Sequence, residues 1–431
     1  MRTTPINSYF FEKNRQKLLK ILPPHSLAII PAASNIISTA DQHYPFRQNS
    51  DFYYLTGINH PNAILMLSPD HDKAEFREVL FIPEITEHDK TWNGNILTSE
   101  KATLLSGIKK IMLANEFEAI VSSFAEKIKT FYLPITDIAK TAYDIPVNQR
   151  KLAHYIQEVH PLHHFERLSP IIHSLRRIKE EAEIQQIKKA IDITRKGFLS
   201  SLKVISPGKR EYEIEAEITA EFIRNGANGH GFLPIIASGA NACILHYINN
   251  DCICNDGDLI LMDIGAEHNY YNADITRTVP VNGRFTSRQR QVYEAVYRLH
   301  NNIISMIKPG ISIEALNQQT IPFIEKELVD LKLITPAELK KQLPEKLLYR
   351  KYLMHGVAHS LGIDVHDPNN KHDTLEENMV ITCEPGIYIA EEGIGIRLEN
   401  DILITQDGGI NLSIDIPIDA DAIESLMHNK Y

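Results

Sequence analysis

The segment Leu259–Val281, LILMDIGAEHNYYNADITRTVPV, decides the fold of the C-terminal part of this chain. Its two apolar, β-branched halves predict antiparallel strands that are joined by a tight turn. A turn centred between His268 and Asn269 places Asp263 directly opposite Asp274. Residues opposite each other on antiparallel strands point to the same face, with Cβ atoms about 4.5–5.5 Å apart. The segment therefore predicts two carboxylates side by side on one hairpin.

A second segment, Thr382–Asp401, repeats this arrangement with the sequence TCEPGIYIAEEGIGIRLEND. A turn centred between Glu391 and Glu392 places Glu384 opposite Glu399. Two like charges opposite each other destabilise a sheet, so each pair needs a compensating positive charge. Two such pairs in matching positions indicate bound divalent cations, for which carboxylates are suitable ligands.

An alternative interpretation leaves these acids without metal, either solvated or paired with nearby arginines. Arg277 lies close to Asp274 in the sequence, and Arg397 lies close to Glu399. For either acid alone this alternative is the better interpretation. For four acids in two matching hairpins, metal binding is the better one.

The remaining sequence predicts two domains, residues 1–173 and residues 174–431. In the first, apolar runs such as Ser26–Pro31 alternate with polar helical stretches, which is typical of an α/β domain. The second begins with an amphipathic helix near Glu180–Lys203 and shows twice the order helix, Pro-Gly, helix, hairpin. This repeated order predicts a pseudo-symmetric domain with its site where the two halves meet.

The composition excludes several classes of protein. The chain has 431 residues, of which 43% are hydrophobic, and a net charge of −10, so we expect neither disorder nor nucleic-acid binding. No apolar run approaches the roughly 20 residues that cross a bilayer, and the first residues lack the apolar core of a secretory signal. The four cysteines form no disulfide framework. We therefore expect a cytoplasmic protein without membrane contacts.

Three histidines in the segment LMHGVAHSLGIDVHDP are candidates for the same site as the acids: His355, His359 and His366. Neutral imidazole binds metals and also acts as a general acid or base near pH 7. His246 precedes the first hairpin in a comparable position. One histidine combined with four carboxylates makes an oxygen-rich site, which suits Mn²⁺, Mg²⁺ or Co²⁺ better than structural zinc.

Six motifs, taken in order, resemble the proline-specific branch of the pita-bread metallopeptidases. They are ILHY, LMDIGAE, NADITRTVPVNG, HGVAHSLGIDVHD, CEPGIYI and GIGIRLENDILIT. The closest match is aminopeptidase P, with prolidase as a near relative, and Tyr44–Ile58, YPFRQNSDFYYLTGI, resembles the N-terminal domain of that family. The resemblance spans nearly the whole chain. It implies an α+β pita-bread domain that follows an α/β N-terminal domain.

The resemblance also implies an activity and its residues. The activity is metal-dependent release of the first residue from peptides with proline at position two, by a homodimer or homotetramer with two divalent ions. Manganese is the commonest metal, and Co²⁺, Mg²⁺ or Zn²⁺ are alternatives. The implied metal ligands are Asp263, Asp274, His359, Glu384 and Glu399. The implied catalytic residues are His246, His355, His366, Glu384 and Arg397, and the implied substrate contacts are His246, His355 and Tyr388.

A mechanism follows from two ions that share a water. Divalent ions about 3.5–4 Å apart lower the pKa of such a water, so that hydroxide forms near neutral pH. We expect the hydroxide to attack the carbonyl of the first residue, and Glu384 to carry a proton to the proline nitrogen. His246 and His366 are candidates to stabilise the oxyanion. His355 is expected to orient the substrate, and Arg397 to hydrogen-bond the ligand carboxylates.

Two alternative functions remain open. Prolidase cleaves only dipeptides and needs a basic group for the substrate carboxylate, which the sequence does not locate. A non-catalytic pita-bread module that binds peptides has usually lost metal ligands, whereas all five are present here. Ser360, in place of a bulkier aromatic residue, and the short connection Ala390–Gly393 leave peptide length open. Trp92, the only tryptophan, either caps a substrate pocket or is an ordinary half-buried aromatic residue.

Overall fold

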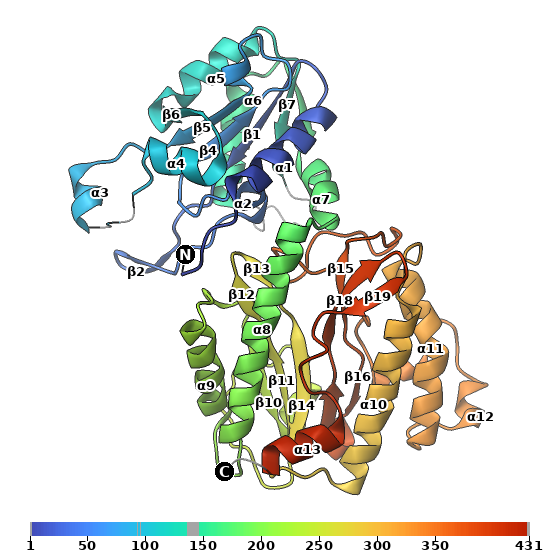
Figure 1. The fold of residues 1–431 in the computed structure, drawn as a ribbon. Coiled ribbons are helices and arrows are strands. Elements are labelled where there is room, and N and C mark those ends of the chain that lie inside the picture. Colours follow the sequence, from blue (N-terminus) through green and yellow to red (C-terminus); the bar gives the residue numbers. More distant parts are fainter. Residues whose placement is uncertain (1, 93, 95, 136–145, 429–431) are drawn as a thin grey trace. The chain divides into compact units, whose positions relative to one another are not determined.

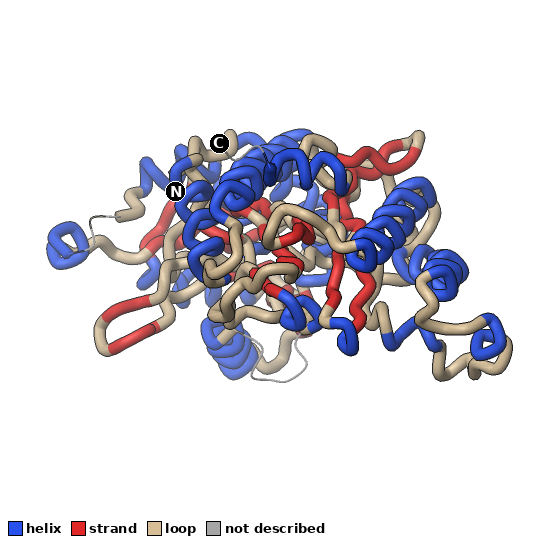
Figure 2. Tube along the Cα trace, turned by 90° about the horizontal axis from the view of Figure 1, so that it is seen from below, coloured by secondary structure: helices blue, strands red, loops and turns tan. Residues whose placement is uncertain are grey.

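The computed structural model describes residues 2–92, 94, 96–135 and 146–428 and contains two compact units (Figure 1). The units comprise residues 3–176 and 177–431. They divide at the end of helix α7 (Ser169–Arg177), whereas the sequence-based boundary after residue 173 lies inside this helix. Figure 2 distinguishes the helices, strands and loops along the same trace. Within the described ranges, no helix is both long and apolar enough to cross a bilayer.

The N-terminal unit is built on a six-stranded sheet with the strand order β6-β5-β4-β1-β7-β8. Its helices are α1 (Ser8–Ile21), α2 (Ser50–Thr56), α3 (Glu87–Trp92), α4 (Ser99–Ser106), α5 (Phe117–Ala125), α6 (Val147–Val159) and α7. Its strands are β1 (Ser26–Pro31), β4 (Ile64–Leu67), β5 (Glu78–Ile82), β6 (Lys110–Leu113), β7 (Thr130–Leu133) and β8 (His164–Arg167), with a separate pair β2 (Ile37–Thr39) and β3 (Gln42–His43). The mixture of parallel and antiparallel pairs with flanking helices is the predicted α/β architecture.

Apolar burial explains why these segments fold in this way. Every residue of β1 is buried, and Leu27 and Ile29 of this strand pack in one core with Phe81 of β5 and Phe131 of β7. All residues of α2 except Ser50 are buried as well. Gly57 ends α2 with φ of 66°, and a Cβ atom at this position would lie 2.2 Å from the Phe11 ring. Only glycine accommodates both this backbone conformation and this close contact.

The C-terminal unit contains the two predicted repeats of helix pair and hairpin. Its helices are α8 (Glu181–Val204), α9 (Glu211–Arg224), α10 (Ser287–Met306), α11 (Ile313–Asp330), α12 (Pro336–Leu339) and α13 (Ala420–His428). Its strands are β9 (Gly229–His230), β10 (Ile235–Ser238), β11 (Leu259–Ile264), β12 (Ala266–His268), β13 (Tyr271–Asn272), β14 (Ile275–Pro280), β15 (Val380–Cys383), β16 (Gly386–Ile389), β17 (Ile394–Arg397), β18 (Asn400–Thr405) and β19 (Gly408–Asn411). Figure 1 shows these strands between α8 and α9 on one side and α10 and α11 on the other.

Helix α8 has the predicted amphipathic pattern, with Ile184, Ile187, Ile191 and Phe198 all buried. It packs along α9, and Gly197 permits the close approach of Phe222. In the second repeat, α10 begins with the predicted capping box of Thr286 and Gln289 and packs along α11. Each helix pair therefore covers strands of its own repeat.

The first hairpin does not have the register that the sequence predicts. Asp263 on β11 pairs with Thr276 on β14, so the prediction that Asp263 lies directly opposite Asp274 is wrong. The cause is the turn, which is centred between Asn269 and Tyr270. Both residues have positive φ, 49° and 72°, as a two-residue turn that matches the twist of a hairpin requires. The true turn lies one residue later than the predicted one.

The second hairpin has the predicted register. Gly386 on β16 pairs with Arg397 on β17, and the β15–β18 pairing continues the same register. Glu384 and Glu399 lie between these two ladders. The position of the turn thus places these two acids across from each other, as the sequence predicts.

Candidate active site

A cavity of about 650 Å³ in the C-terminal unit brings the candidate site residues together. Its polar lining includes Asp263, Asp274, Glu384, Glu399, Arg397, His246, His355, His359 and His366. Its apolar lining consists of Phe232, Leu233, Ile235, Leu245, Ile248, Ala358 and Val365. The acids of both hairpins therefore face one space, although they are more than a hundred residues apart in the sequence.

Three of the candidate metal ligands converge most closely. Oxygen atoms of Asp274 and Glu399 and a ring nitrogen of His359 lie within 4.8 Å of one another. His359 Nε2 is 3.4 Å from Asp274 Oδ2 and 3.8 Å from Glu384 Oε1. Its Nδ1 lies 3.1 Å from the carbonyl of Ser360, which only accepts hydrogen bonds. The proton is therefore on Nδ1, and the Nε2 lone pair faces the acids, as a metal ligand requires.

The fourth acid of the group, Asp263, is held from one side only. Arg397 Nη2 donates to Asp263 Oδ2 at 2.6 Å. The other oxygen, Oδ1, is buried and has no hydrogen-bond partner among the described residues. A buried carboxylate oxygen without a donor is unfavourable unless a cation binds it. This orphaned atom is the signature expected of a metal ligand.

The acids would repel one another strongly without a cation. Burial, followed by neighbouring carboxylates, raises the pKa of Asp274 and of Glu399 well above the usual range. Burial is also the main cause that raises the pKa of Glu384. Four carboxylates with one imidazole are a suitable ligand set for two divalent cations with a preference for oxygen. The residues present therefore fit the implied pair of ions.

A series of hydrogen bonds connects the Asp263 carboxylate to His355, which is half-buried. Arg397 Nη1 donates to the Tyr388 hydroxyl at 2.9 Å, and this hydroxyl lies 2.8 Å from His355 Nε2. His355 Nδ1 donates to the Gly356 carbonyl at 2.7 Å, so Nε2 accepts from Tyr388. Burial lowers the pKa of His355 to about 4, which keeps the ring neutral. Both of its ring nitrogens are thus engaged, which suits an orienting role.

The other two histidines are placed differently. The His366 ring packs edge-on against the His359 ring, with centroids 4.3 Å apart, and burial lowers the pKa of His366 to about 4. The side chain of His246 lines the cavity but makes no hydrogen bond to any described residue. Its position therefore depends on the loop that carries it.

Two polar residues of the site escaped the sequence analysis. Thr276 Oγ1 donates to Glu399 Oε2 at 2.6 Å and accepts from Arg397 Nε at 3.1 Å. Asp401 is fully buried and accepts from the backbone N–H of Asp274 at 3.2 Å. Asp401 lies next to the apolar run ILIT in a buried strand. Asp263 likewise lies next to an apolar run, LILM, in a buried strand. An acid in an apolar strand is a pattern visible in the sequence, and this pattern could have identified Asp401.

Among the described residues Arg277 forms no salt bridge with Asp274, contrary to the alternative interpretation that paired the two; its charge acts on Glu399 and Asp401 instead. Its buried guanidinium donates to four backbone carbonyls. The acceptors are the carbonyls of Pro417 at 2.7 Å, Thr276 at 2.9 Å, Glu399 at 2.6 Å and Ile416 at 3.0 Å. Arg277 thereby connects β14, the start of β18 and a segment near the end of the chain, and fixes the backbone of Glu399.

Replacing Arg277 with alanine is therefore expected to destabilise the metal-loaded enzyme. The change leaves several buried carbonyls without donors, which we expect to lower the free energy of unfolding by about 3 kcal/mol or more. Urea denaturation of both proteins measures this difference. Arg284→Ala, which removes an exposed guanidinium bonded to His428, is the control and should change stability by less than about 0.5 kcal/mol. Equal stability of the two variants would contradict the role of Arg277.

The structure places the three features that left specificity open: Ser360, the connection Ala390–Gly393 and Trp92. Ser360 is buried, pairs with Ile381 and does not line the cavity. The connection Ala390–Gly393 is a single turn of 3₁₀ helix that Gly393 ends at positive φ. Trp92 is 76% exposed and stacks on His88, so it is not the half-buried aromatic residue of the alternative interpretation.

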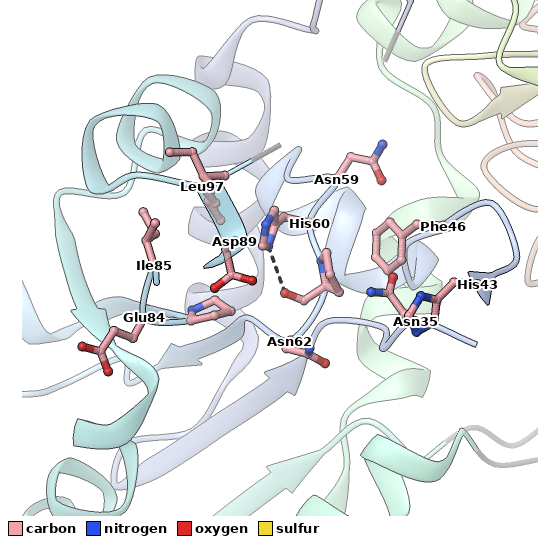
Figure 3. A pocket seen from close by; sticks show the side chains of 13 residues that line it. Asn35, His43, Phe46, Asn59, His60, Asn62, Glu84, Ile85, Asp89 and Leu97 are labelled. Atoms are coloured by element: carbon pink, nitrogen blue, oxygen red, sulfur yellow. Dashed lines mark hydrogen bonds between the residues drawn. The ribbon is translucent and has the colours of Figure 1, made fainter. Parts of the chain in front are cut away.

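A second cavity, of about 380 Å³, lies in the N-terminal unit (Figure 3). Asparagine side chains, His43, His60, Glu84 and Asp89 line it, and His60 Nδ1 lies 3.0 Å from the Pro61 carbonyl. Among the described residues, neither of the two groups of converging His, Cys, Asp or Glu lies in this unit. The chemistry of the chain therefore concentrates in the C-terminal cavity.

Two hairpins that direct four acids into one cavity, beside a histidine from the segment between them, define the class of metallohydrolases with a pita-bread domain. Residues 185–406 match the model of metallopeptidase family M24, and residues 11–132 match the model of the aminopeptidase P N-terminal domain. The chain belongs to metallopeptidase family M24 and has the two-domain organisation of aminopeptidase P. It is a metal-dependent aminopeptidase, and thus a hydrolase.

Relatives and solved structures support this assignment over the full length. The chain is 35% identical to the Xaa-Pro aminopeptidase of Escherichia coli K12, with 97% of both chains covered, and 32% identical to human Xaa-Pro aminopeptidase 3, with 89% of this chain and 77% of the relative covered. A structure of a putative aminopeptidase P from Bacillus anthracis matches with a TM-score of 0.92 and 39% identity over 98% of this chain and 99% of that one. Zn-substituted E. coli aminopeptidase P in complex with product matches with a TM-score of 0.88 and 34% identity over 99% of this chain and 100% of that one.

Proposed function

We propose that the enzyme releases the N-terminal residue from peptides with proline at position two. We further propose that Asp263, Asp274, His359, Glu384 and Glu399 hold the metal ions. The observation that carries the proposal is the convergence of these side chains in one cavity, with a buried Asp263 oxygen that has no donor. The names of the relatives, Xaa-Pro aminopeptidases, support the choice of substrate over that of prolidase.

Manganese is the metal that we propose for this site. When bound, two divalent ions supply Lewis acidity and lower the pKa of a water molecule. Four carboxylates favour Mn²⁺, Mg²⁺ or Co²⁺ over metals that prefer sulfur ligands. Zinc remains an alternative, because the zinc-substituted form of a relative has been solved.

The proposed ligand Glu384 and the residues around the metal site transfer the proton, bind the substrate and orient Asp263. Burial raises the pKa of Glu384, so this carboxylate is suited to accept a proton from the attacking water and deliver it to the proline nitrogen. His366 and His246 face the same cavity, where they would hold the substrate carbonyl. The series of hydrogen bonds from Arg397 through Tyr388 to His355 orients the Asp263 carboxylate. The apolar wall, which includes Phe232 and Leu245, suits the proline ring, which has no N–H to satisfy.

We also propose a cytoplasmic homodimer or homotetramer that binds peptides but neither nucleic acid nor membranes. The net charge of −10 disfavours contacts with phosphates. All four cysteines are free, which fits a reducing compartment.

A short peptide panel tests the substrate. With manganese present, we expect Xaa-Pro-Yaa tripeptides to be hydrolysed at the Xaa-Pro bond. Matched Xaa-Ala-Yaa peptides should give a kcat/KM lower by about 100-fold or more, because the site would lose its fit to the tertiary amide and ring. Mass spectrometry of the products measures both. Hydrolysis of the Xaa-Pro dipeptide alone would make the enzyme a prolidase, and equal rates on alanine peptides would exclude proline specificity.

A further inference from the structure

A buried carboxylate outside the metal centre accepts five hydrogen bonds. Glu211 is the first residue of α9 and is 0% exposed. Its Oε1 accepts from the backbone N–H of Ser238 at 2.7 Å, from the Ser238 hydroxyl at 2.7 Å and from Asn241 Nδ2 at 3.1 Å. Its Oε2 accepts from the Tyr247 hydroxyl at 2.7 Å and from the backbone N–H of Cys252 at 2.9 Å. Its acceptor capacity is thus filled by protein donors.

This arrangement does not favour a second metal site. Ligand atoms of Glu211, Asp251 and Cys252 do lie within 4.8 Å of one another. A cation at this position would have to displace the donors that already point at both oxygens of Glu211, and like-sign N–H and O–H dipoles would repel it. The carboxylate instead organises the chain around it.

The donors all belong to one loop, residues 238–252, which carries His246 into the active-site cavity. Tyr247, whose hydroxyl binds Glu211, is the next residue along the chain from His246. His246 itself makes no hydrogen bond to any described residue, so its own side chain does not fix its position. Glu211 contacts the loop at its beginning, beside His246 and at its end.

A second residue of α9 supports the same loop. Glu215, one turn after Glu211 and on the same helix face, accepts from Asn250 Nδ2 at 2.8 Å. Asn250 is 2% exposed, and its side chain also binds Pro234 and Ile236 of the β10 region. One face of α9 therefore holds the loop that presents His246.

We propose that Glu211 is a positioning residue that acts through His246, an inference that rests on the substrate-holding role of His246 in the proposed function. A carboxylate is needed because five donors from three parts of the loop converge on it. Glutamine has the same shape but presents an NH₂ group to donors, so at least one hydrogen bond is lost and another becomes a repulsive contact. The loop then loses its fixed conformation, and His246 leaves its place beside the substrate.

The test is a double-mutant cycle with the manganese-loaded enzyme and an Xaa-Pro-Yaa peptide. We expect Glu211→Gln to lower kcat/KM by about tenfold or more while metal content stays at the wild-type level. In the background of His246→Ala, the same substitution should have no further effect, because the residue through which it acts is already gone. A residue that only supports folding would reduce activity equally in both backgrounds, and that result would overturn the proposal.

Glu213→Gln is the matched control. Glu213 lies in the same first turn of α9, but its carboxylate binds Lys209 and the backbone of Arg210 and does not contact residues 238–252. The control should keep wild-type activity even where its melting temperature falls as far as that of Glu211→Gln. If Glu211→Gln kept wild-type activity while His246→Ala was impaired, the role of Glu211 would be refuted and the role of His246 would stand. Wild-type activity of His246→Ala would refute the role of His246, and with it this inference.

Discussion

Replacing Glu399 with alanine is expected to abolish both metal binding and turnover in a chain that remains folded. Glu399 contributes an oxygen to the group that converges with Asp274 and His359, so its removal would deprive the proposed metal site of one carboxylate ligand. We expect kcat to fall by more than about 1000-fold, because the reaction depends on the metal-activated water. Elemental analysis of the purified protein gives the metal content, and hydrolysis of an Xaa-Pro-Yaa peptide gives the rate.

Glu391→Ala serves as the control for this substitution. Glu391 lies in the turn of the same hairpin, but it is exposed and pairs with Lys351 at the surface. Its replacement should leave metal content and rate unchanged. If Glu399→Ala bound metal as the wild-type enzyme does, Glu399 would not be a ligand and the proposed site would have to be revised.

Removing the metal ions is expected to leave a protein whose stability falls as the pH rises. The folded-state pKa values of Asp274 and Glu399 lie well above the ordinary values of these side chains, through burial and repulsion by neighbouring carboxylates. The folded metal-free chain thus retains protons that the unfolded chain releases. Stability is full below about pH 4 and decreases above that pH, because the unfolded chain releases protons that the folded chain retains until the pH passes the raised pKa values.

Urea denaturation at about pH 5 and about pH 8, with and without metal, measures this effect. The metal-loaded enzyme should lack the loss at the higher pH, because the cations neutralise the ionised ligands. The metal-free Glu399→Gln variant should be more stable at the higher pH than the metal-free wild-type chain, since it carries one buried acid fewer. A metal-free wild-type chain that gained stability between the two pH values, relative to the loaded form, would contradict the picture of repelling acids.

The sequence predicted the candidate ligands because they break a local rule. An acid such as Asp263 in a buried, apolar strand is unfavourable unless something compensates for it, and this conflict is visible without a structure. The register of the second hairpin was predictable too, because its short connection fixes the position of the turn. The first was not, because a buried Tyr270 at positive φ is a conformation that residue preferences do not suggest.

Glu211 shows the opposite situation. An acid in the first turn of a helix is ordinary, since it interacts favourably with the helix dipole. Nothing in the local sequence indicates that donors about 27 to 41 residues later return to the same carboxylate. Thr276 is similar, because only the observed pairing with Asp263 reveals that its hydroxyl stands between Arg397 and Glu399. The roles of Glu211 and Thr276 depend on tertiary contacts, and the local sequence does not predict such contacts.

The hydrogen bonds of Arg277 also connect the candidate site to a segment that is synthesised much later than Arg277. Two of its acceptors, the carbonyls of Ile416 and Pro417, are translated 139 and 140 residues after Arg277 itself. A nascent chain that lacks this segment contains all five proposed metal ligands but lacks two of the four hydrogen bonds that Arg277 donates. We therefore expect the Glu399 backbone to reach its final position only after Ile416 and Pro417 have been synthesised.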